Sequence, residues 1–389
     1  MRVSIRAVFS LGIFVLTATC GGGGGGGSSS PTFGNNGVVI HNNAAGGNSE
    51  DVGSSIIIDG QGKILVTGHS KNANFNEDMV IWRFSSNGTL DNSFGNNGVV
   101  VHNNAAGGNS SDRGNSIAID GNGRIIITGT SFNGNNNDMV IWRYNSDGTL
   151  DISFGNNGFV VHNNAAGGNS HDWGFSVTTD SQNKVLVTGT SHNANNNYDM
   201  VIWRYNSNGT LDNSFGNNGI VVHDNAAGGN GDDIGSSIVV DSNGKIVVAG
   251  YSSNGSNNDM VIWRYNSDGT LDNSFGNSGI VVHNNAAGGN SDDVGVSIVV
   301  DNQGRILITG SSKNSNGDRD MAVWRYNPNG TLDNTFGNNG IVVRNNAAGG
   351  DGNDHGSSIW VDNGGNVFVT GYSINGSGDN DMVIWKVYP

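Results

Sequence analysis

A tryptophan recurs at an almost constant interval along most of this 389-residue chain. Consecutive copies lie 60 or 61 residues apart, at Trp82, Trp142, Trp203, Trp263, Trp324 and Trp385. Self-similarity at a fixed period of this length is the signature of a repeat architecture, in which each unit is one supersecondary structure that packs against its neighbours. The chain is therefore interpreted as six copies of one unit of about 60 residues.

Each unit contains four short apolar runs separated by Gly, Asn and Asp. We call them strands A, B, C and D; in one unit they read SSIVVD (236–241), KIVVAGY (245–251), DMVIWRY (259–265) and GIVVHN (279–284). Their length and their content of β-branched and aromatic residues are typical of strands, and no stretch of the unit shows a helical period. The sequence predicts an all-β domain.

The apolar residues in these runs are consecutive, which indicates that both faces of each sheet are covered. Four-stranded antiparallel sheets packed face to face around an axis meet that requirement, and they are the blades of a β-propeller. A parallel β-helix is the rival, because 60 residues could form about three rungs, but the unit shows no 20-residue sub-period. We predict a six-bladed β-propeller over residues 33–389.

The array of repeats begins with the last strand of the unit and ends with the third. Residues 33–47, FGNNGVVIHNNAAGG, carry a strand D with no strand C before it, and the chain ends on DMVIWKVYP, a strand C with no strand D after it. Pairing of the N-terminal strand, Gly37 to His41, with the last blade would close the ring and remove two open sheet edges. We expect this closure.

The unit resembles a known family of repeats. LDNSFGNNGIVV (211–222), DDIGSSIVVDSNGKIVVAGYS (232–252) and DMVIWRYNSDG (259–269) are similar to the delta-60 repeat family of bacterial β-propeller proteins and, for the middle segment, to the related bacterial β-propeller repeat. The likeness covers Phe33 to Trp385 and implies the propeller fold. The family is one of exported proteins, and no catalytic motif accompanies the resemblance.

The first twenty residues have the pattern of an export signal. Arg2 and Arg6 precede an apolar run that is too short to span a membrane, and the only cysteine of the chain, Cys20, follows it. We predict a signal peptide over 1–20 with a lipobox-like end, lipidation of Cys20, and a Gly/Ser tether over 21–32 with a reach of roughly 15 to 20 Å. The protein would be a bacterial outer-membrane or cell-surface lipoprotein, with a secreted or periplasmic protein as the alternative.

Charge limits the class of partner. The formal net charge is -15, with only 18 Lys and Arg residues. Nucleic acids and anionic membrane surfaces require a basic patch, so we expect neither to be a partner. A protein or a glycan fits this composition better.

Three recurring polar residues admit a structural explanation. The Asp that ends strand A is predicted to form an Asx turn, with a ring of metal ligands as the alternative. The Arg or Lys after each Trp is predicted to pair with a recurring Asp, because a charge inside an apolar run is costly unless paired; anion binding is the alternative. The His of strand D is interpreted as a surface or rim residue.

The turn between strands C and D partly matches a calcium loop. In NSDGTLD the candidate ligands are Asp147 and Asp151, and in the equivalent turn Asp268 and Asp272, but an Arg occupies the first ligand position. Calcium requires several oxygen ligands including carboxylates. We therefore expect no cofactor and no metal, with weak calcium binding as the alternative.

The repeats differ most where strand D joins strand A. This loop contains an Asp in every unit, whereas the residues on either side of it vary, as do the loops between strands B and C. In a propeller these loops share one face, and binding usually resides in loops on a rigid scaffold. The candidate ligand-binding residues are Trp173, Arg113, His171, His355, Glu50, Asp232 and Asp292. Neutral drift in exposed loops is the alternative.

We expect a non-enzymatic protein that binds a protein or glycan through this loop face. The alternative is a structural cell-surface repeat protein with no small ligand. A propeller hydrolase or lyase is a further alternative, but catalysis requires unlike groups at one place, and near-identical blades repeat the same groups. The cluster nearest to that requirement is His171, Trp173, His192 and Tyr198 in the third unit.

Overall fold

The computed structural model describes residues 33–388, which form strands and turns. The predicted signal peptide, the tether and Cys20 lie outside the described residues. Within residues 33–388, no helix has the length and apolarity needed to cross a membrane. All strands pair antiparallel within six separate sheets, so the prediction of an all-β chain is confirmed.

Each sheet is built from consecutive strands and forms one blade. Blade 1 contains β1 (Gly46–Ile58), β2 (Ile64–Asn72), β3 (Glu77–Phe84) and β4 (Val99–His102). Blade 2 contains β5 (Asp112–Ile119), β6 (Ile125–Phe132), β7 (Asn137–Tyr144) and β8 (Phe159–His162). Blade 3 contains β9 (Gly167–Thr179), β10 (Val185–Asn193), β11 (Tyr198–Tyr205) and β12 (Ile220–His223).

The last three blades follow the same plan with one strand fewer at the end. Blade 4 contains β13 (Asp233–Val240), β14 (Ile246–Ser253), β15 (Asn258–Tyr265) and β16 (Ile280–His283). Blade 5 contains β17 (Gly288–Val300), β18 (Ile306–Asn314), β19 (Arg319–Tyr326) and β20 (Ile341–Arg344). Blade 6 contains only β21 (Gly349–Val361), β22 (Val367–Asn375) and β23 (Asn380–Val387).

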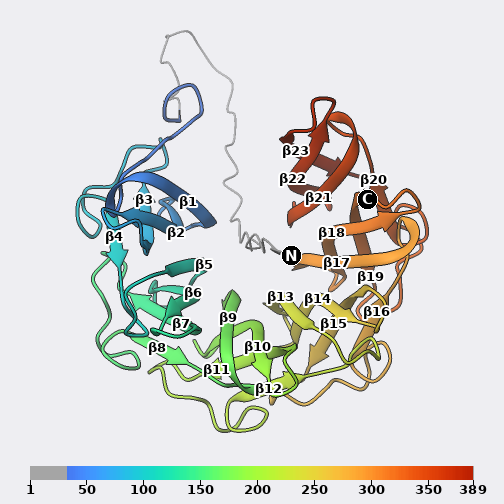
Figure 1. Ribbon diagram of the computed structural model, residues 1–389, viewed down its shortest axis with the longest axis horizontal. Helices are drawn as coiled ribbons and strands as arrows, with labels where there is room; N and C mark the ends of the chain where they lie inside the picture. Colours follow the sequence, from blue (N-terminus) through green and yellow to red (C-terminus); the bar gives the residue numbers. More distant parts are fainter. Residues whose placement is uncertain (1–32, 389) are drawn as a thin grey trace.

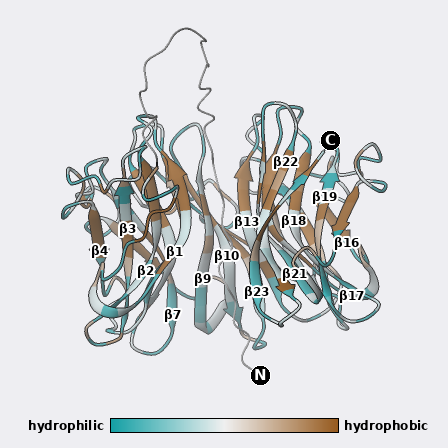
Figure 2. Cartoon of the chain, turned by 90° about the horizontal axis from the view of Figure 1, so that it is seen from above, coloured by the Kyte–Doolittle hydropathy of each residue, from teal (hydrophilic) through white to brown (hydrophobic). Residues whose placement is uncertain are grey.

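The blades are arranged in sequence order around a common centre, with the first strand of each blade innermost (Figure 1). This is the six-bladed β-propeller that the repeat predicts. Hydrophobic segments lie along the strands, and the connecting loops at both ends are hydrophilic (Figure 2). The rigid strands thus present two sets of polar loops, one on each face.

The core lies between the blades. Met139 and Ile141 of blade 2 pack in one cluster with Val201 and Trp203 of blade 3, and the other junctions repeat this arrangement. Every residue of β3 is buried, polar ends included. Because the third strands of blades 1 to 5 are covered on both faces, the apolar residues at their centres are consecutive, as the sequence predicts.

The predicted pairing of the N-terminal strand with blade 6 is absent from this structure. β23 ends the sheet of blade 6, and the ring is open between blades 1 and 6 (Figure 1). Residues 38–41 lie instead against blade 1: the N–H of Gly34 donates to the Asn87 carbonyl at 2.7 Å, and Trp82 Nε1 donates to His41 Nδ1 at 3.1 Å. The backbone bond of Gly34 recurs at the outer strands of blades 1 to 4, whereas the bond from Trp82 to His41 replaces the bond that His102, His162 and His223 make with a Tyr hydroxyl of the next blade.

The open ring leaves apolar side chains in solvent. Met382 and Ile384 on β23 are 72% and 65% exposed, whereas Met79 and Ile81 at the equivalent positions of blade 1 are fully buried. Ile40 of the N-terminal segment is 86% exposed. The edge strand β23 and the N-terminal segment thus both expose apolar side chains.

Candidate functional site

The variable loops lie on one face, as predicted. Antiparallel pairing places the start of the first strand beside the end of the second, as in Gly46 with Asn72. It also places the start of the third strand beside the end of the fourth, as in Met79 with His102. We call the side of the ring that carries these ends, with the loops between fourth and first and between second and third strands, the loop face.

The invariant Asp of this face is structural. In blade 3 the two carboxylate oxygens of Asp172 accept the N–H groups of Asn164 (2.9 Å) and Ala165 (3.3 Å), which fixes the loop that enters β9. Burial raises the pKa of Asp172 and, in blade 4, raises the pKa of Asp233 to about 6. The equivalent Asp accepts the same pair of bonds in every blade, at Asp51, Asp112, Asp172, Asp233, Asp293 and Asp354.

The four unlike residues of blade 3 come together on the loop face. Trp173 stacks on Tyr198 with ring centroids 5.3 Å apart, and His171 lies 5.4 Å from Trp173. His192 meets the edge of Tyr198 at 5.2 Å. Trp173, Tyr198 and both histidines are partly exposed, so this aromatic cluster offers ring surface to a ligand.

The aromatic cluster is tied to both neighbouring blades. His171 Nδ1 accepts the N–H of Asn137 in blade 2 at 3.1 Å, and Asp232 of blade 4 accepts the N–H of Tyr198 at 3.0 Å. Desolvation lowers the pKa of His171, with a further contribution from His192. The predicted site residues His171 and Asp232 therefore position the cluster as well as lining it.

Arg113 belongs to a separate charged cluster at the junction of blades 1 and 2. Its guanidinium donates to the Glu77 carboxylate through Nε and Nη2, the latter at 2.7 Å. Ser111 Oγ donates to the same carboxylate at 2.9 Å. His69 Nε2 lies 3.9 Å from Glu77, and Lys71 pairs with the predicted Glu50 at 2.9 Å. Desolvation lowers the pKa of His69.

Sequence reasoning did not select His69, Lys71 and Glu77 individually. The signal was present for His69 and Glu77, because each is unique at its position among the six units: the equivalents of Glu77 are Asn137, Tyr198, Asn258, Arg319 and Asn380. These positions lie at the ends of strands that the repeat makes uniform. Only the packing of blade 1 against blade 2 shows that Glu77 meets Arg113.

The remaining candidates lie at other junctions. Asp292 accepts the N–H of Asn258 at 3.2 Å and pairs with Arg319 at 2.8 Å. His355 meets the edge of Tyr372 at 5.4 Å, and burial lowers its pKa to about 4. The predicted residues thus share a face but are spread around the ring in separate groups. His171, Trp173 and Asp232 gather around Tyr198, and Arg113 and Glu50 belong to the charged cluster of blades 1 and 2.

The predicted pairing of the recurring Arg is confirmed in blades 1 to 5. Arg143 Nε donates to Asp151 at 2.8 Å, and the guanidinium lies 4.4 Å above the Phe154 ring. Its Nη1 donates to the carbonyl of Ser207 in blade 3. In blade 6 the equivalent Lys386 lies over the rings of Phe368 and Tyr388 instead.

The strand D histidines, interpreted as surface or rim residues, are partly exposed and also contact the next blade. His162 hydrogen-bonds to the Tyr205 hydroxyl of the next blade at 2.9 Å and meets the edge of Trp203. Burial lowers its pKa to about 4. The following blade covers part of the outermost strand, which sequence periodicity within one unit does not reveal.

The calcium candidates already hold internal partners. Asp147 and Asp268 accept the N–H and hydroxyl of the Thr two residues later. Asp151 and Asp272 pair with Arg143 and Arg264. Among residues 33–388, no group of three or more His, Cys, Asp or Glu side chains is placed to hold a metal ion.

The Asx turns predicted after each first strand are present. Asp180 Oδ1, for example, accepts the N–H groups of Gln182 and Lys184 at 2.8 and 2.9 Å. The same two bonds form at Asp59, Asp120, Asp241, Asp301 and Asp362.

Five stretches of the chain match the model of a family described as "Domain of unknown function (DUF5122) beta-propeller": residues 62–94, 121–154, 182–215, 242–275 and 304–336. The chain is a β-propeller repeat protein. Each matched stretch runs from the turn before the second strand to the Phe beneath the recurring Arg. A search of curated protein sequences finds no match to this β-propeller.

Solved structures resemble this β-propeller only distantly. They include a protein of unknown function from Dyadobacter fermentans DSM 18053 (11% identity, 85% of this chain and 93% of that chain covered, TM-score 0.46). They also include a glucose dehydrogenase (9%, 85% and 94%, 0.47) and the polysaccharide lyase Uly1 (9%, 99% and 89%, 0.44). At this level of similarity they carry no argument about activity.

Proposed function

We propose that this β-propeller is a non-enzymatic binding protein that holds a glycan on its loop face. The observation that carries the proposal is the aromatic cluster of blade 3, in which Trp173 stacks on Tyr198 between His171 and His192. Trp173 is replaced by aliphatic, Arg or His residues in the other five blades. A partly exposed aromatic platform that occurs once in a repeat is not required by the fold.

The surroundings of the cluster suit a hydroxylated ligand. Asn195, Asn196 and Asn197 precede Tyr198, and Asp232 lies beside it. A binding site of this kind combines apolar and aromatic surface with a few polar groups that fix orientation. Sugar rings have apolar C–H faces for the aromatic rings and hydroxyl groups for the amides and carboxylates.

A protein partner is the second candidate. The clusters around Glu77 with Arg113 and around Asp292 with Arg319 place charges of both signs at variable positions of the same face. Charge complementarity of this kind guides the association of proteins. Such a partner would contact several blades at once.

The proposal includes export and a lipid anchor on Cys20, at the outer membrane or cell surface, with a secreted or periplasmic form as the alternative. It rests on the N-terminal sequence: two Arg residues, an apolar run, and the single Cys followed by Gly and Ser. The tether would let the ring reach away from the membrane.

The test of the glycan proposal is a glycan array followed by titration calorimetry of the best ligand with the Trp173→Ala variant. Loss of a stacking platform should weaken binding at least tenfold, which corresponds to about 1.4 kcal/mol. Trp360→Ala is the matched control, because Trp360 also lies on a first strand but pairs with Phe368 in blade 6. Absence of any glycan ligand, or equal affinity of the Trp173→Ala variant, would contradict the proposal.

A further inference from the structure

Phe75 breaks a local rule that the equivalent residues obey. It lies on the loop face, in the loop between β2 and β3, and is 75% exposed. Its φ is +63°, in the left-handed region where bulky residues are strained. The three other loops of this length have Asn196, Gly317 and Gly378 at this position, also with positive φ. The turn therefore does not require a Phe, and a strained apolar ring in solvent points to a role outside the fold.

Phe75 and the aromatic cluster of blade 3 belong to one continuous surface, with the loops of blade 2 between them. Beside Phe75, Asn76 Nδ2 donates at 2.9 Å to the carbonyl of Asn109, in the loop that enters blade 2. One blade later, Asn136 Nδ2 donates at 3.5 Å to the carbonyl of Asn169, in the loop that enters blade 3. These bonds join the loop of Phe75 step by step to the aromatic cluster.

The two aromatic surfaces are too far apart for a single sugar ring. Packed sheets lie about 10 Å apart, and two such spacings separate blades 1 and 3. The loop tips of blades 1, 2 and 3 each present an exposed amide, at Asn74, Asn135 and Asn195. An amide side chain both donates and accepts hydrogen bonds, as the hydroxyl groups of a sugar do. A chain of several sugars can therefore stack on Phe75 at one end and on Trp173 at the other.

The charges along this surface favour a neutral ligand. Lys71 pairs with Glu50 at 2.9 Å, and Arg113 pairs with Glu77, so both cations already have partners. The whole chain carries a formal net charge of -15, which repels a polyanion. A neutral polysaccharide avoids this repulsion and leaves the existing ion pairs intact.

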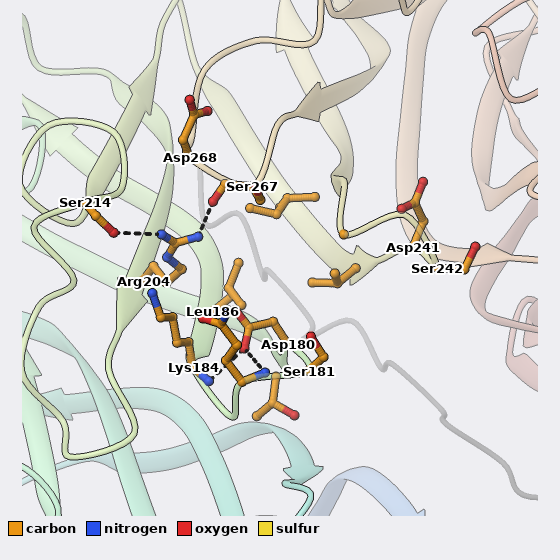
Figure 3. A pocket seen from close by; sticks show the side chains of 15 residues that line it. Asp180, Ser181, Lys184, Leu186, Arg204, Ser214, Asp241, Ser242, Ser267 and Asp268 are labelled. Atoms are coloured by element: carbon orange, nitrogen blue, oxygen red, sulfur yellow. Dashed lines mark hydrogen bonds between the residues drawn. The ribbon is translucent and has the colours of Figure 1, made fainter.

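The face opposite the loop face offers less to such a ligand. A hollow of about 620 Å³ lies there between blades 3 and 4 (Figure 3). Arg204 at its side already donates to Ser214 Oγ and to the Ser267 carbonyl. The apolar residues that line it, Leu186 and Ile246, are buried. The exposed aromatic rings that a sugar chain needs lie on the loop face.

We propose that the loop face binds an extended, neutral polysaccharide chain, with one sugar on Phe75, another on Trp173 and the intervening sugars over the loops of blade 2. This inference rests on the proposed glycan-binding function. It adds the class of glycan, a chain rather than a short sugar, and it adds Phe75 as a second aromatic contact.

The test is titration calorimetry of the full chain with cello-, xylo-, manno- and malto-oligosaccharides, each as a disaccharide and as a hexasaccharide. We expect the hexasaccharide of at least one series to bind at least tenfold more tightly than its disaccharide, because only the longer chain reaches both rings. Phe75→Asn, which copies Asn196 of blade 3, should remove this difference and leave the disaccharide affinity unchanged. Trp173→Ala should weaken the binding of both.

Ile152→Asn is the matched control. Ile152 is 74% exposed and lies on the opposite face, in the turn between β7 and β8. Its equivalents in blades 1, 3, 4 and 5 are Asn92, Asn213, Asn273 and Asn334. This variant should change neither affinity. Thermal unfolding should give Phe75→Asn an unfolding temperature at least as high as that of the unmodified protein, because Asn is favoured in the left-handed conformation.

The outcomes separate this inference from the proposed function. Equal affinity for disaccharides and hexasaccharides, or a difference that persists in Phe75→Asn, overturns the inference and leaves the aromatic cluster of blade 3 as the whole glycan site. A lower unfolding temperature of Phe75→Asn also overturns it, because the turn would then require Phe75. If no oligosaccharide binds, or if Trp173→Ala binds them all as well as the unmodified protein, the proposed function fails too.

Discussion

His162 lies at the end of β8, where it hydrogen-bonds to Tyr205 and meets the Trp203 ring of the next blade. Burial lowers its pKa from 6.5 to about 4. As pH falls from 6.5 to about 4, the unfolded chain binds the proton first, so His162 progressively lowers the free energy of unfolding over this window. Below about pH 4 both states are protonated and this effect is complete.

Comparing the pH dependence of stability in the unmodified protein and in the His162→Asn variant isolates the contribution of this residue. Buried Asp172 and Asp233 have raised pKa values and act in the opposite direction, since the folded state then binds protons first as pH falls. Urea unfolding from pH 7 to pH 4 should show the unmodified protein losing at least about 1.4 kcal/mol more stability than the variant, the equivalent of one pKa unit. If the free energy of unfolding falls by the same amount with pH in the unmodified protein and in the variant, the protonation of His162 does not affect stability.

At the scale of the element, Arg143 connects the end of blade 2 to blade 3. Its side chain is 1% exposed, pairs with Asp151, lies over Phe154 and donates to the Ser207 carbonyl of the next blade. Arg143→Met should lower the free energy of unfolding by about 3 kcal/mol, because it leaves a partly buried carboxylate and a carbonyl without their donor. Urea denaturation measures the change.

Arg344→Met is the control for this junction. Arg344 replaces the strand D histidine in blade 5, is exposed, and donates only to the carbonyl of Val343. Its removal should change stability by no more than about 0.5 kcal/mol. If both variants lose the same stability, the Arg143 network contributes no more than a surface residue.

The elements could be predicted from sequence because their causes are local. Consecutive apolar residues, the Gly and Asn turns and the Asp after each first strand recur six times, and each acts within one hairpin. The Arg–Asp pair was also predictable, since a charge in an apolar strand needs a partner. Contacts between blades were not: the burial of His162 and the meeting of Glu77 with Arg113 depend on which strand faces which neighbour, and one unit does not contain that information.

At the scale of the whole molecule, the N-terminal segment already makes one of the two sets of contacts that would close the ring, the set with blade 1. The N–H of Gly34 donates to the Asn87 carbonyl, as the N–H of Gly95 donates to that of Asp147 one blade later. Val39 packs with Trp82 in the apolar cluster of blade 1. The N-terminal segment therefore takes the position against blade 1 that each outer strand takes against the following blade. Its pairing with β23 and the packing of blade 6 against blade 1 are absent from this structure.

The register of that pairing follows from the other blades. Met79 pairs with His102, Val80 with Val101, Ile81 with Val100 and Trp82 with Val99. Transferred to the ends of the chain, this register pairs His41 with Met382, Ile40 with Val383, Val39 with Ile384 and Val38 with Trp385. Closure would cover Met382 and Ile384 and remove two open edges, which otherwise favour association with other chains.

Disulfide trapping tests this closure. In a Cys20→Ser background, Ile40→Cys with Val383→Cys places two thiols in register, and we expect an oxidised monomer with a higher unfolding temperature. Ile40→Cys with Ile384→Cys is the matched control, because adjacent residues of a strand point to opposite faces and this pair should cross-link poorly. A cross-link found only between two chains would instead show strand exchange. The absence of any cross-link would show that the ring stays open, with β23 as its free edge.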